Sequence, residues 1–127
     1  FNDSKCTTPE ATVTAVNSLA EQRGTSGHVH LIAGGYDKKA DLSPIAALAP
    51  SLAGLYCIGA TGPAIAAGAG GGVHTCGTLD AAVRSAAPLM KPGDVLLLSP
   101  GCASWDQYIN YEHRGDEFVR LVKEVAP

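Results

Sequence analysis

The sequence has no excess of basic residues and no long apolar run, and each absence excludes a class of protein. Nine lysine and arginine residues stand against twelve aspartate and glutamate residues, which gives a formal net charge of −3. A domain that binds nucleic acid is normally basic, so we expect no nucleic-acid partner. No stretch approaches the roughly 18 apolar residues of a membrane-spanning helix, and no basic-then-apolar signal peptide opens the chain. We therefore expect no membrane partner.

The cysteines also lack the spacing of a metal or redox motif. They are Cys6, Cys57, Cys76 and Cys102, and no two of them form a C-x-x-C pair. A structural zinc site and a thioredoxin-type motif therefore have no support. Cys57 and Cys102 lie in or beside apolar runs, where a free thiol packs as a small hydrophobic group. We expect reduced cysteines and a cytoplasmic protein rather than a secreted one.

Length and composition indicate one folded domain. The chain has 127 residues, which fits a single domain that buries roughly two-thirds of the surface exposed by its unfolded chain. Hydrophobic residues make up 46% of the chain, which excludes disorder over most of its length. The opening residues 1–5 are typical of a strand end that runs into a loop. We therefore expect residues 1–127 to be one domain of a longer protein.

Helix-start signals alternate with short apolar runs along the chain. The runs predict four strands, at residues 28–33, 55–58, 73–76 and 95–99. Apolar residues at helical spacing predict five helices, over residues 9–23, 45–52, 62–67, 79–89 and 112–125. This alternation implies parallel strands joined by right-handed crossovers. The predicted fold is α/β, a three-layer Rossmann-like domain with a mostly parallel sheet and helices on both faces. Residues 66–72 are nearly free of side chains, and we expect them to be mobile.

Polar clusters follow the predicted strands. Ligands of parallel sheets lie beyond the carboxyl ends of the strands, which here are residues 3–5, 34–39, 59–62 and 99–106. Lys5 precedes a helix start that favours an anion, although helix capping beside a solvated lysine explains these residues equally well. Lys38 follows two glycines that allow close backbone approach, and its charge can reach a phosphate or carboxylate. From the pattern alone, a solvated charged turn is the favoured interpretation of that loop.

Several familiar catalytic motifs are absent. The sequence has no G-x-x-x-x-G-K-[ST] phosphate loop, no G-x-G-x-x-G in the right place after a strand and no G-x-S-x-G elbow. Cys102 is a poor candidate for a nucleophile because no base is implied near it. His28 and His30 share one strand face without a third ligand nearby, so we predict no metal site.

Charged residues around the last predicted helix are expected to have structural roles. His113 and Arg114 lie at the start of that helix, close in sequence to several carboxylates. We predict that they pair with Asp106, Glu112 or Asp116 rather than perform chemistry.

Four segments together resemble one family. They are Asp3-Ser4-Lys5-Cys6-Thr7, Gly34-Gly35-Tyr36-Asp37-Lys38, the run from Leu97 to Ser104 and the run from Asn110 to Phe118. In order, they are similar to the signatures of the C-terminal domain of the ATP-dependent Mur ligase family of bacterial cell-wall synthesis. The S-P-x-C-A-S-x-D-Q run followed by x-R-G-x-x-F is specific, and the D-S-K-x-T start resembles the branch that adds D-glutamate. The resemblance extends from Phe1 to Val125.

The resemblance implies a reaction and a set of roles. ATP, with Mg²⁺, phosphorylates the carboxylate of UDP-N-acetylmuramoyl-L-alanine, and the amine of D-glutamate then attacks the acyl phosphate. By the family motifs, Asp3 contacts the nucleotide, through its ribose, and Lys38 lies near the reacting groups as a catalytic residue. The residues implied to hold D-glutamate are Lys5, Thr7, Ser104 and Tyr111. Cys6 replaces a common alanine and Tyr111 a frequent phenylalanine, which is tolerated if that contact is made by the backbone.

The resemblance also implies what lies elsewhere. The phosphate loop, the magnesium ligands and the UDP-substrate site belong to the N-terminal and central domains of the family, so we expect this chain alone to be inactive. Two other interpretations stay open. One is a free-standing Rossmann-like module that binds a small anionic metabolite or nucleotide without catalysis, and the other is a Mur-type ligase for a different amino acid.

Overall fold

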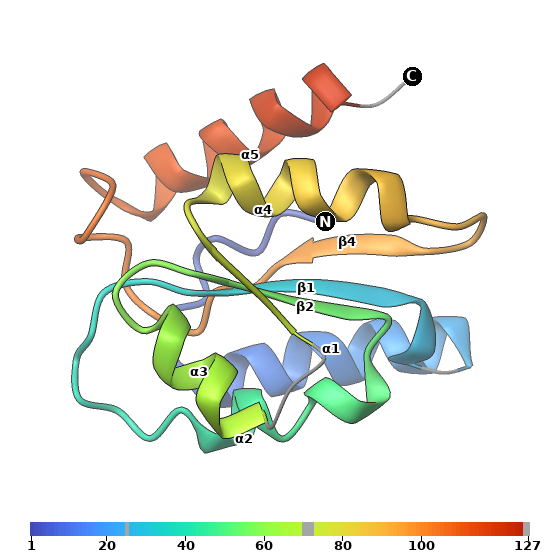
Figure 1. Ribbon diagram of the computed structural model, residues 1–127, viewed down its shortest axis with the longest axis horizontal. Coiled ribbons are helices and arrows are strands. Elements are labelled where there is room, and N and C mark those ends of the chain that lie inside the picture. The colour runs from blue at the N-terminus through green and yellow to red at the C-terminus, as the bar shows by residue number, and fades with distance from the viewer. Residues whose placement is uncertain (25, 70–72, 126–127) are drawn as a thin grey trace.

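A four-stranded sheet forms the centre of the computed structural model, which describes residues 1–24, 26–69 and 73–125. The strands are β1 Val29–Gly34, β2 Gly54–Ile58, β3 His74–Gly77 and β4 Val95–Leu98. They lie in the order β3-β2-β1-β4, and every neighbouring pair is parallel (Figure 1). In register, Leu31 of the central strand β1 lies between Leu55 of β2 and Leu97 of β4. The parallel sheet predicted from alternation is confirmed.

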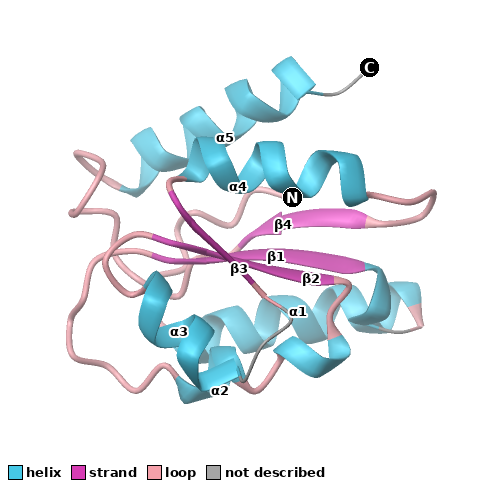
Figure 2. Ribbon diagram, viewed as in Figure 1, coloured by secondary structure: helices cyan, strands magenta, loops and turns pink. Residues whose placement is uncertain are grey.

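Helices cover both faces of this sheet. They are α1 Pro9–Arg23, α2 Ser43–Ala46, α3 Gly62–Ala69, α4 Leu79–Ala86 and α5 Tyr111–Val125. The first three lie on one face and the last two on the other, which makes three layers (Figure 2). The predicted α/β fold with helices on both faces is therefore confirmed. No helix in the described ranges is long and apolar enough to cross a bilayer.

The two faces of the sheet form separate cores. Successive side chains of a strand point to opposite faces, so Leu31 joins the core under α1, α2 and α3. The next residue, Ile32, joins the core under α4 and α5, together with Phe118 of α5. Strands buried on both faces are apolar without interruption, and this is why short apolar runs alone located β1, β2 and β4 in the sequence.

Two helices are shorter than predicted, and proline explains both. The predicted helix over 45–52 ends at Ala46 and resumes as a 3₁₀ turn over Ala49–Ser51, which contains Pro50. The predicted helix over 79–89 ends at Ala86, one turn before Leu89, and Pro88 lies in the 3₁₀ turn between them. Proline lacks the N–H that continues a helix, and its ring clashes with the carbonyl four residues earlier.

Part of the glycine-rich run is helical. Residues 66–69 belong to α3, which ends at Ala69, two residues beyond the predicted end of this helix. Residues 70–72 lie outside the described residues.

The first residues of the chain extend the sheet beside β4. Asn2 forms a parallel bridge with Leu98. The backbone N–H of Asp3 donates to the carbonyl oxygen of Leu98 at 2.7 Å, and the N–H of Leu98 donates to the carbonyl of Phe1 at 3.0 Å. The segment that starts at Asp3 therefore leaves the sheet at the same edge as the loops after β1, β2 and β4.

Candidate functional site

The loops after β1 and β4 are joined by backbone hydrogen bonds. The N–H of Gly34 donates to the carbonyl of Pro100 at 2.9 Å, and the N–H of Tyr36 donates to the carbonyl of Ala103 at 2.8 Å. These bonds continue the parallel sheet into an antiparallel bridge between the two loops. The two loops, far apart in the sequence, therefore form one surface at the carboxyl edge of the sheet.

The loop after β2 joins the same surface through Thr61. Its hydroxyl accepts a hydrogen bond from the N–H of Gly35 at 2.9 Å, and its own N–H donates to the carbonyl of Gly35 at 3.1 Å. Gly59 lies so close that a Cβ there would stand 2.6 Å from the Cα of Gly35. Only glycine allows the two backbones to approach in this way. The Gly34-Gly35 pair is thus explained by contact between loops.

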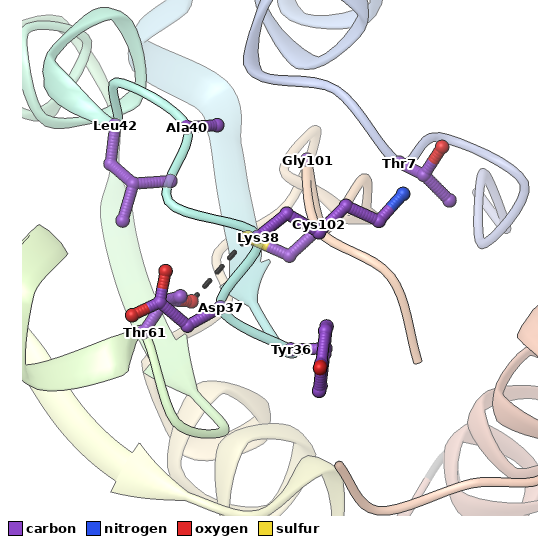
Figure 3. A pocket seen from close by; sticks show the side chains of 9 residues that line it. All are labelled: Thr7, Tyr36, Asp37, Lys38, Ala40, Leu42, Thr61, Gly101 and Cys102. Atoms are coloured by element: carbon purple, nitrogen blue, oxygen red, sulfur yellow. Dashed lines mark hydrogen bonds between the residues drawn. The ribbon is translucent and has the colours of Figure 1, made fainter. Parts of the chain in front are cut away.

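A small pocket lies where these loops meet the start of α1 (Figure 3). Its lining residues are Thr7, Tyr36, Asp37, Lys38, Ala40, Leu42, Thr61, Gly101 and Cys102. The Lys38 side chain extends across the pocket toward Thr7, so two residues predicted for the site come together (Figure 3). The pocket volume of about 20 Å³ is room for about one water molecule. A larger ligand would therefore lie over this pocket and not inside it.

Lys38 also contacts an exposed aromatic pair. Its Nζ lies 5.2 Å from the centre of the Trp105 ring, and the Tyr36 ring centre lies 5.5 Å from that of Trp105. Trp105 remains 63% exposed. A cation–π contact at an exposed site contributes about 0.5–1 kcal/mol. This is enough to bias the position of a flexible lysine without fixing it. The neighbouring Lys39 instead pairs with Asp37 at 3.2 Å.

Lys5 and Tyr111 line a second, shallower groove of about 280 Å³ between the first residues of the chain and α5. Glu112 and Asp116 line the same groove. An anion bound at Lys5 would therefore meet two carboxylates unless it approached from the side of Thr7, which lines the first pocket. Of the predicted D-glutamate residues, Thr7 thus lines the first pocket, whereas Lys5 and Tyr111 line this second groove.

Asp3 and Ser104 differ in how they could meet a ligand. The Oδ2 of Asp3, which is partly buried, accepts a hydrogen bond from the hydroxyl of Ser99 at 2.9 Å. Asp3 therefore does not cap α1; Thr8 does, since its hydroxyl accepts from the N–H of Ala11. Ser104 is only 2% exposed and lines neither pocket. Its hydroxyl could reach a ligand only if the segment after β4 moved.

The predicted ion pairs of Arg114 are wrong. The residue is 1% exposed, and its guanidinium donates from Nε and Nη2 to the hydroxyl and carbonyl of Ser4 and from Nη1 to the carbonyl of Cys102, at 2.8–2.9 Å. Across the described ranges, no carboxylate lies within 4.0 Å of it. Burial lowers the pKa of the guanidinium.

The neighbouring predictions also fail. Asp106 accepts a hydrogen bond from the N–H of Ala60 at 2.9 Å and so caps the loop after β2. The ring of His113 packs edge-on against Tyr108, with 5.0 Å between centres, and not against a carboxylate.

Cys102 has no features of a nucleophile. It is 4% exposed, and burial raises the pKa of its thiol. Its sulfur lies 3.4 Å from the hydroxyl of Thr61, which is no general base. This agrees with the sequence, in which no base is implied near Cys102.

Histidines gather at the opposite, amino-terminal edge of the sheet. One oxygen of Asp94 lies 3.0 Å from Nδ1 of His28, and the other lies 2.8 Å from Nε2 of His30. These hydrogen bonds lower the pKa of Asp94 to about 2. His30 is further held by the hydroxyl of Tyr56 at 2.9 Å. Within the described part of the chain, no group of three or more histidine, cysteine, aspartate or glutamate residues could hold a metal ion.

Comparison with known proteins identifies similar sequences. The family model described as "Mur ligase, glutamate ligase domain" matches residues 1–102. The UDP-N-acetylmuramoylalanine--D-glutamate ligase of Shigella boydii serotype 4 (strain Sb227) is 44% identical over 99% of this chain and 28% of its own length. The proteins of the same name from Escherichia coli (strain K12) and Salmonella choleraesuis (strain SC-B67) are 44% and 43% identical over the same shares. The chain thus spans little more than a quarter of the length of these relatives.

Proposed function

This chain belongs to the Mur ligase family, as a glutamate ligase domain, and from this membership we propose that it supplies the D-glutamate site and part of the nucleotide site of an ATP-dependent ligase. The proposed reaction joins D-glutamate to UDP-N-acetylmuramoyl-L-alanine through an acyl phosphate in cytoplasmic peptidoglycan synthesis. The 44% identity over 99% of the chain to ligases named for D-glutamate supports this substrate.

The main structural support is that Lys38 and Thr7 line one pocket while Lys5 and Tyr111 line the adjoining groove. D-Glutamate carries two carboxylates and one ammonium group. Charge-assisted hydrogen bonds from lysines and hydroxyls are the contacts that a carboxylate favours. We assign the side chains of Lys5 and Thr7 to its carboxylates and Tyr111 to the wall of the groove. Ser104 belongs to the same proposal, with the movement of its segment that burial requires.

We assign Lys38 to the reacting groups and Asp3 to the nucleotide. Attack of the D-glutamate amine on the acyl phosphate builds negative charge on the carbonyl oxygen and the leaving phosphate, and the ammonium of Lys38 would stabilise that charge. Asp3 would accept a hydrogen bond from a ribose hydroxyl of the nucleotide. Ser99 occupies its Oδ2, whereas its Oδ1 has no hydrogen bond within the described residues.

Other parts of the enzyme would complete the site. A pocket of about 20 Å³ is smaller than an amino acid, so we propose that the N-terminal and central domains of the ligase close the crevice and bring UDP-N-acetylmuramoyl-L-alanine. No group of three or more possible metal ligands lies in the described ranges, and we propose that the central domain supplies the ligands of Mg²⁺. We also propose that the chain alone is inactive.

A titration tests ligand recognition by this chain. We expect D-glutamate to shift the backbone NMR signals of Lys5 and Thr7, and L-glutamate to shift them less. ADP should shift the backbone NMR signal of Asp3. Lys5→Glu should abolish the D-glutamate effect. Lys91→Glu, an exposed lysine at the opposite edge of the sheet, is the matched control and should preserve it. Equal responses to D- and L-glutamate, or to ADP alone, would favour a general anion-binding module instead.

A ligase assay tests catalysis. The isolated chain should release no phosphate from ATP in the presence of D-glutamate and UDP-N-acetylmuramoyl-L-alanine, whereas a full-length ligase that contains it should. Phosphate release by the chain alone at the rate of the full-length enzyme would contradict the proposal that the chain needs the other domains for catalysis.

A further inference from the structure

Arg114 is a buried cation whose hydrogen bonds all go to neutral partners. Within the described ranges, its guanidinium donates hydrogen bonds to Ser4 and Cys102 alone, three bonds of 2.8–2.9 Å. A buried charge is costly and is usually paired with an opposite charge. A fully buried arginine that bonds two carbonyls and one hydroxyl therefore calls for an explanation beyond core packing.

Ser4 connects this cation to the proposed ligand residues. It lies between Asp3 and Lys5 in the sequence, and it is 4% exposed. Its hydroxyl accepts from Nε of Arg114 and donates to the carbonyl of Tyr111 at 2.6 Å. Through one side chain, the segment with the proposed nucleotide and D-glutamate residues is joined to the first residue of α5.

The third hydrogen bond reaches the remaining part of the site. Nη1 of Arg114 donates to the carbonyl of Cys102, two residues before Ser104. The neighbouring carbonyl of Ala103 holds Tyr36 of the loop that carries Lys38. The guanidinium of Arg114 thus contacts two segments that carry proposed ligand residues, residues 3–5 and the segment after β4. Its contact with Cys102 lies next to Ala103, which bridges to the third segment, the loop of Lys38.

The packing around Arg114 is shaped for this contact. A Cβ on Gly115 would stand 2.9 Å from the amide nitrogen of Asn2 and 3.2 Å from the Cβ of Ser4. A Cβ on Gly35 would stand 3.3 Å from Nη1 of Arg114. Glycine at position 115 lets α5 approach Asn2 and Ser4, and glycine at position 35 lets the Lys38 loop approach the guanidinium. This accounts for the R-G pair of the x-R-G-x-x-F motif, which the ligand assignments leave unused.

We propose that Arg114 is a positioning residue for the ligand site. It holds residues 3–5, the segment after β4 and the first turn of α5 in one arrangement, so that Lys5 and Tyr111 present to D-glutamate together. Arg114 does not touch the ligand in this role. The proposal rests on the proposed function, because it assumes that those residues form the D-glutamate site.

Arginine suits this role better than lysine. The planar guanidinium offers donors in a fixed fork, and here Nε and the two Nη atoms point to three acceptors on two segments. A lysine would keep the charge but offer a single nitrogen, which cannot span both segments. Arg114→Lys therefore separates the geometry of the fork from its charge.

Steady-state kinetics of a full-length ligase containing this domain provide the functional test. Arg114→Met should raise the KM for D-glutamate at least about tenfold, as expected for the loss of hydrogen bonds to a charged group. Arg114→Lys should retain most of this defect, and Ser4→Ala should share it. Arg120→Met is the matched control, because Arg120 lies on the same helix but is exposed and paired with Glu117 and Glu124; its KM should not change.

The outcomes separate this proposal from the proposed function. If the unaltered enzyme does not use D-glutamate, the proposed function fails. If it does, and a folded Arg114→Lys or Ser4→Ala enzyme has an unchanged KM for D-glutamate, the positioning role fails. A defect in kcat alone, with the KM unchanged, would also overturn it.

If Arg114→Met does not fold, a ligand-free measurement on the 127-residue chain tests whether the segments are positioned together. In Ser4→Ala, backbone NMR signals should shift together at Lys5, Tyr111 and Cys102, while those of His28 and Asp94 at the far edge should not. Shifts restricted to residue 4 and its sequence neighbours would show that the three segments are positioned independently.

Discussion

The ammonium group of Lys38 lies 5.2 Å from the centre of the Trp105 ring. Trp105 is the only tryptophan of the chain and is exposed. The proposed catalytic lysine therefore has an optical reporter beside it.

Iodide quenching should detect this lysine. The anion accumulates near a cation, so we expect Lys38→Met to lower the iodide quenching constant of Trp105 about twofold at low ionic strength. Quenching by neutral acrylamide should not change. Lys39→Met is the control, since Lys39 pairs with Asp37. A charge effect disappears in concentrated salt, and a difference that persists there would place Lys38 away from Trp105.

Lys38 should also control the chemical step. In a full-length ligase that contains this domain, we expect Lys38→Met to reduce kcat about 100-fold or more, because removal of one group that stabilises transition-state charge commonly costs this much. Lys39→Met should retain nearly full activity. A normal kcat in Lys38→Met would show that another residue stabilises the transition-state charge.

Asp94 should make the stability of the chain depend on pH. Its carboxylate is held by His28 and His30, which lowers its pKa from 3.8 to about 2. A carboxyl whose pKa is lowered by folding stabilises the folded state above its unfolded pKa, and this contribution is lost as the pH falls through the folded pKa. Asp94→Asn should therefore cost about 2 kcal/mol at pH 7. The difference from the unaltered chain should shrink between about pH 5 and pH 2.

Urea unfolding at several pH values measures this effect. Asp80→Asn is a suitable control, because its ion pair with Arg84 is exposed and such pairs contribute about 0–1 kcal/mol. A cost of Asp94→Asn that stayed constant down to pH 2 would contradict the role of the carboxylate charge.

Gly34 should be the glycine least tolerant of substitution. Its φ is +119°, and a Cβ would stand 2.0 Å from the carbonyl oxygen of Ile58. Gly34→Ala should lower the free energy of unfolding by more than about 3 kcal/mol, because strain and overlap add. Gly24 also has a positive φ, +77°, but among the described residues, its chain neighbours apart, no atom lies within 4 Å of its Cβ position. Gly24→Ala should cost only about 1 kcal/mol, and equal costs in thermal unfolding would refute the close approach.

The native chain should offer one reactive thiol. Cys6, Cys57 and Cys102 are buried and Cys76 is partly exposed. Burial raises the pKa of Cys57 to about 11, and the thiolate is the reactive form. A thiol reagent at neutral pH should therefore modify Cys76 first and the other three only after unfolding. Rapid modification that persists in Cys76→Ser would show that a buried thiol becomes exposed.

Local patterns were enough to predict most of the fold. The four strands, the five helices and the parallel sheet follow from short-range signals, such as the apolar run of Leu96-Leu97-Leu98 and the Thr8-Pro9 cap. Even the early ends of α2 and α4 follow from Pro50 and Pro88, whose effect on a helix is local.

The site residues likewise divide into those that local signals predict and those that only the tertiary structure places. The sequence by itself placed Lys5 and Lys38 at strand ends, because a strand followed by glycine or a helix cap is a local signal. Thr7 was implied by the family resemblance. Only the tertiary structure decided that Thr7 and Lys38 share a pocket, that Ser104 is buried and that Arg114 holds Ser4. Ser4 and Arg114 are 110 positions apart. A hydrogen bond over that separation depends on how the whole chain packs, and neither residue's neighbours in the sequence contain that information.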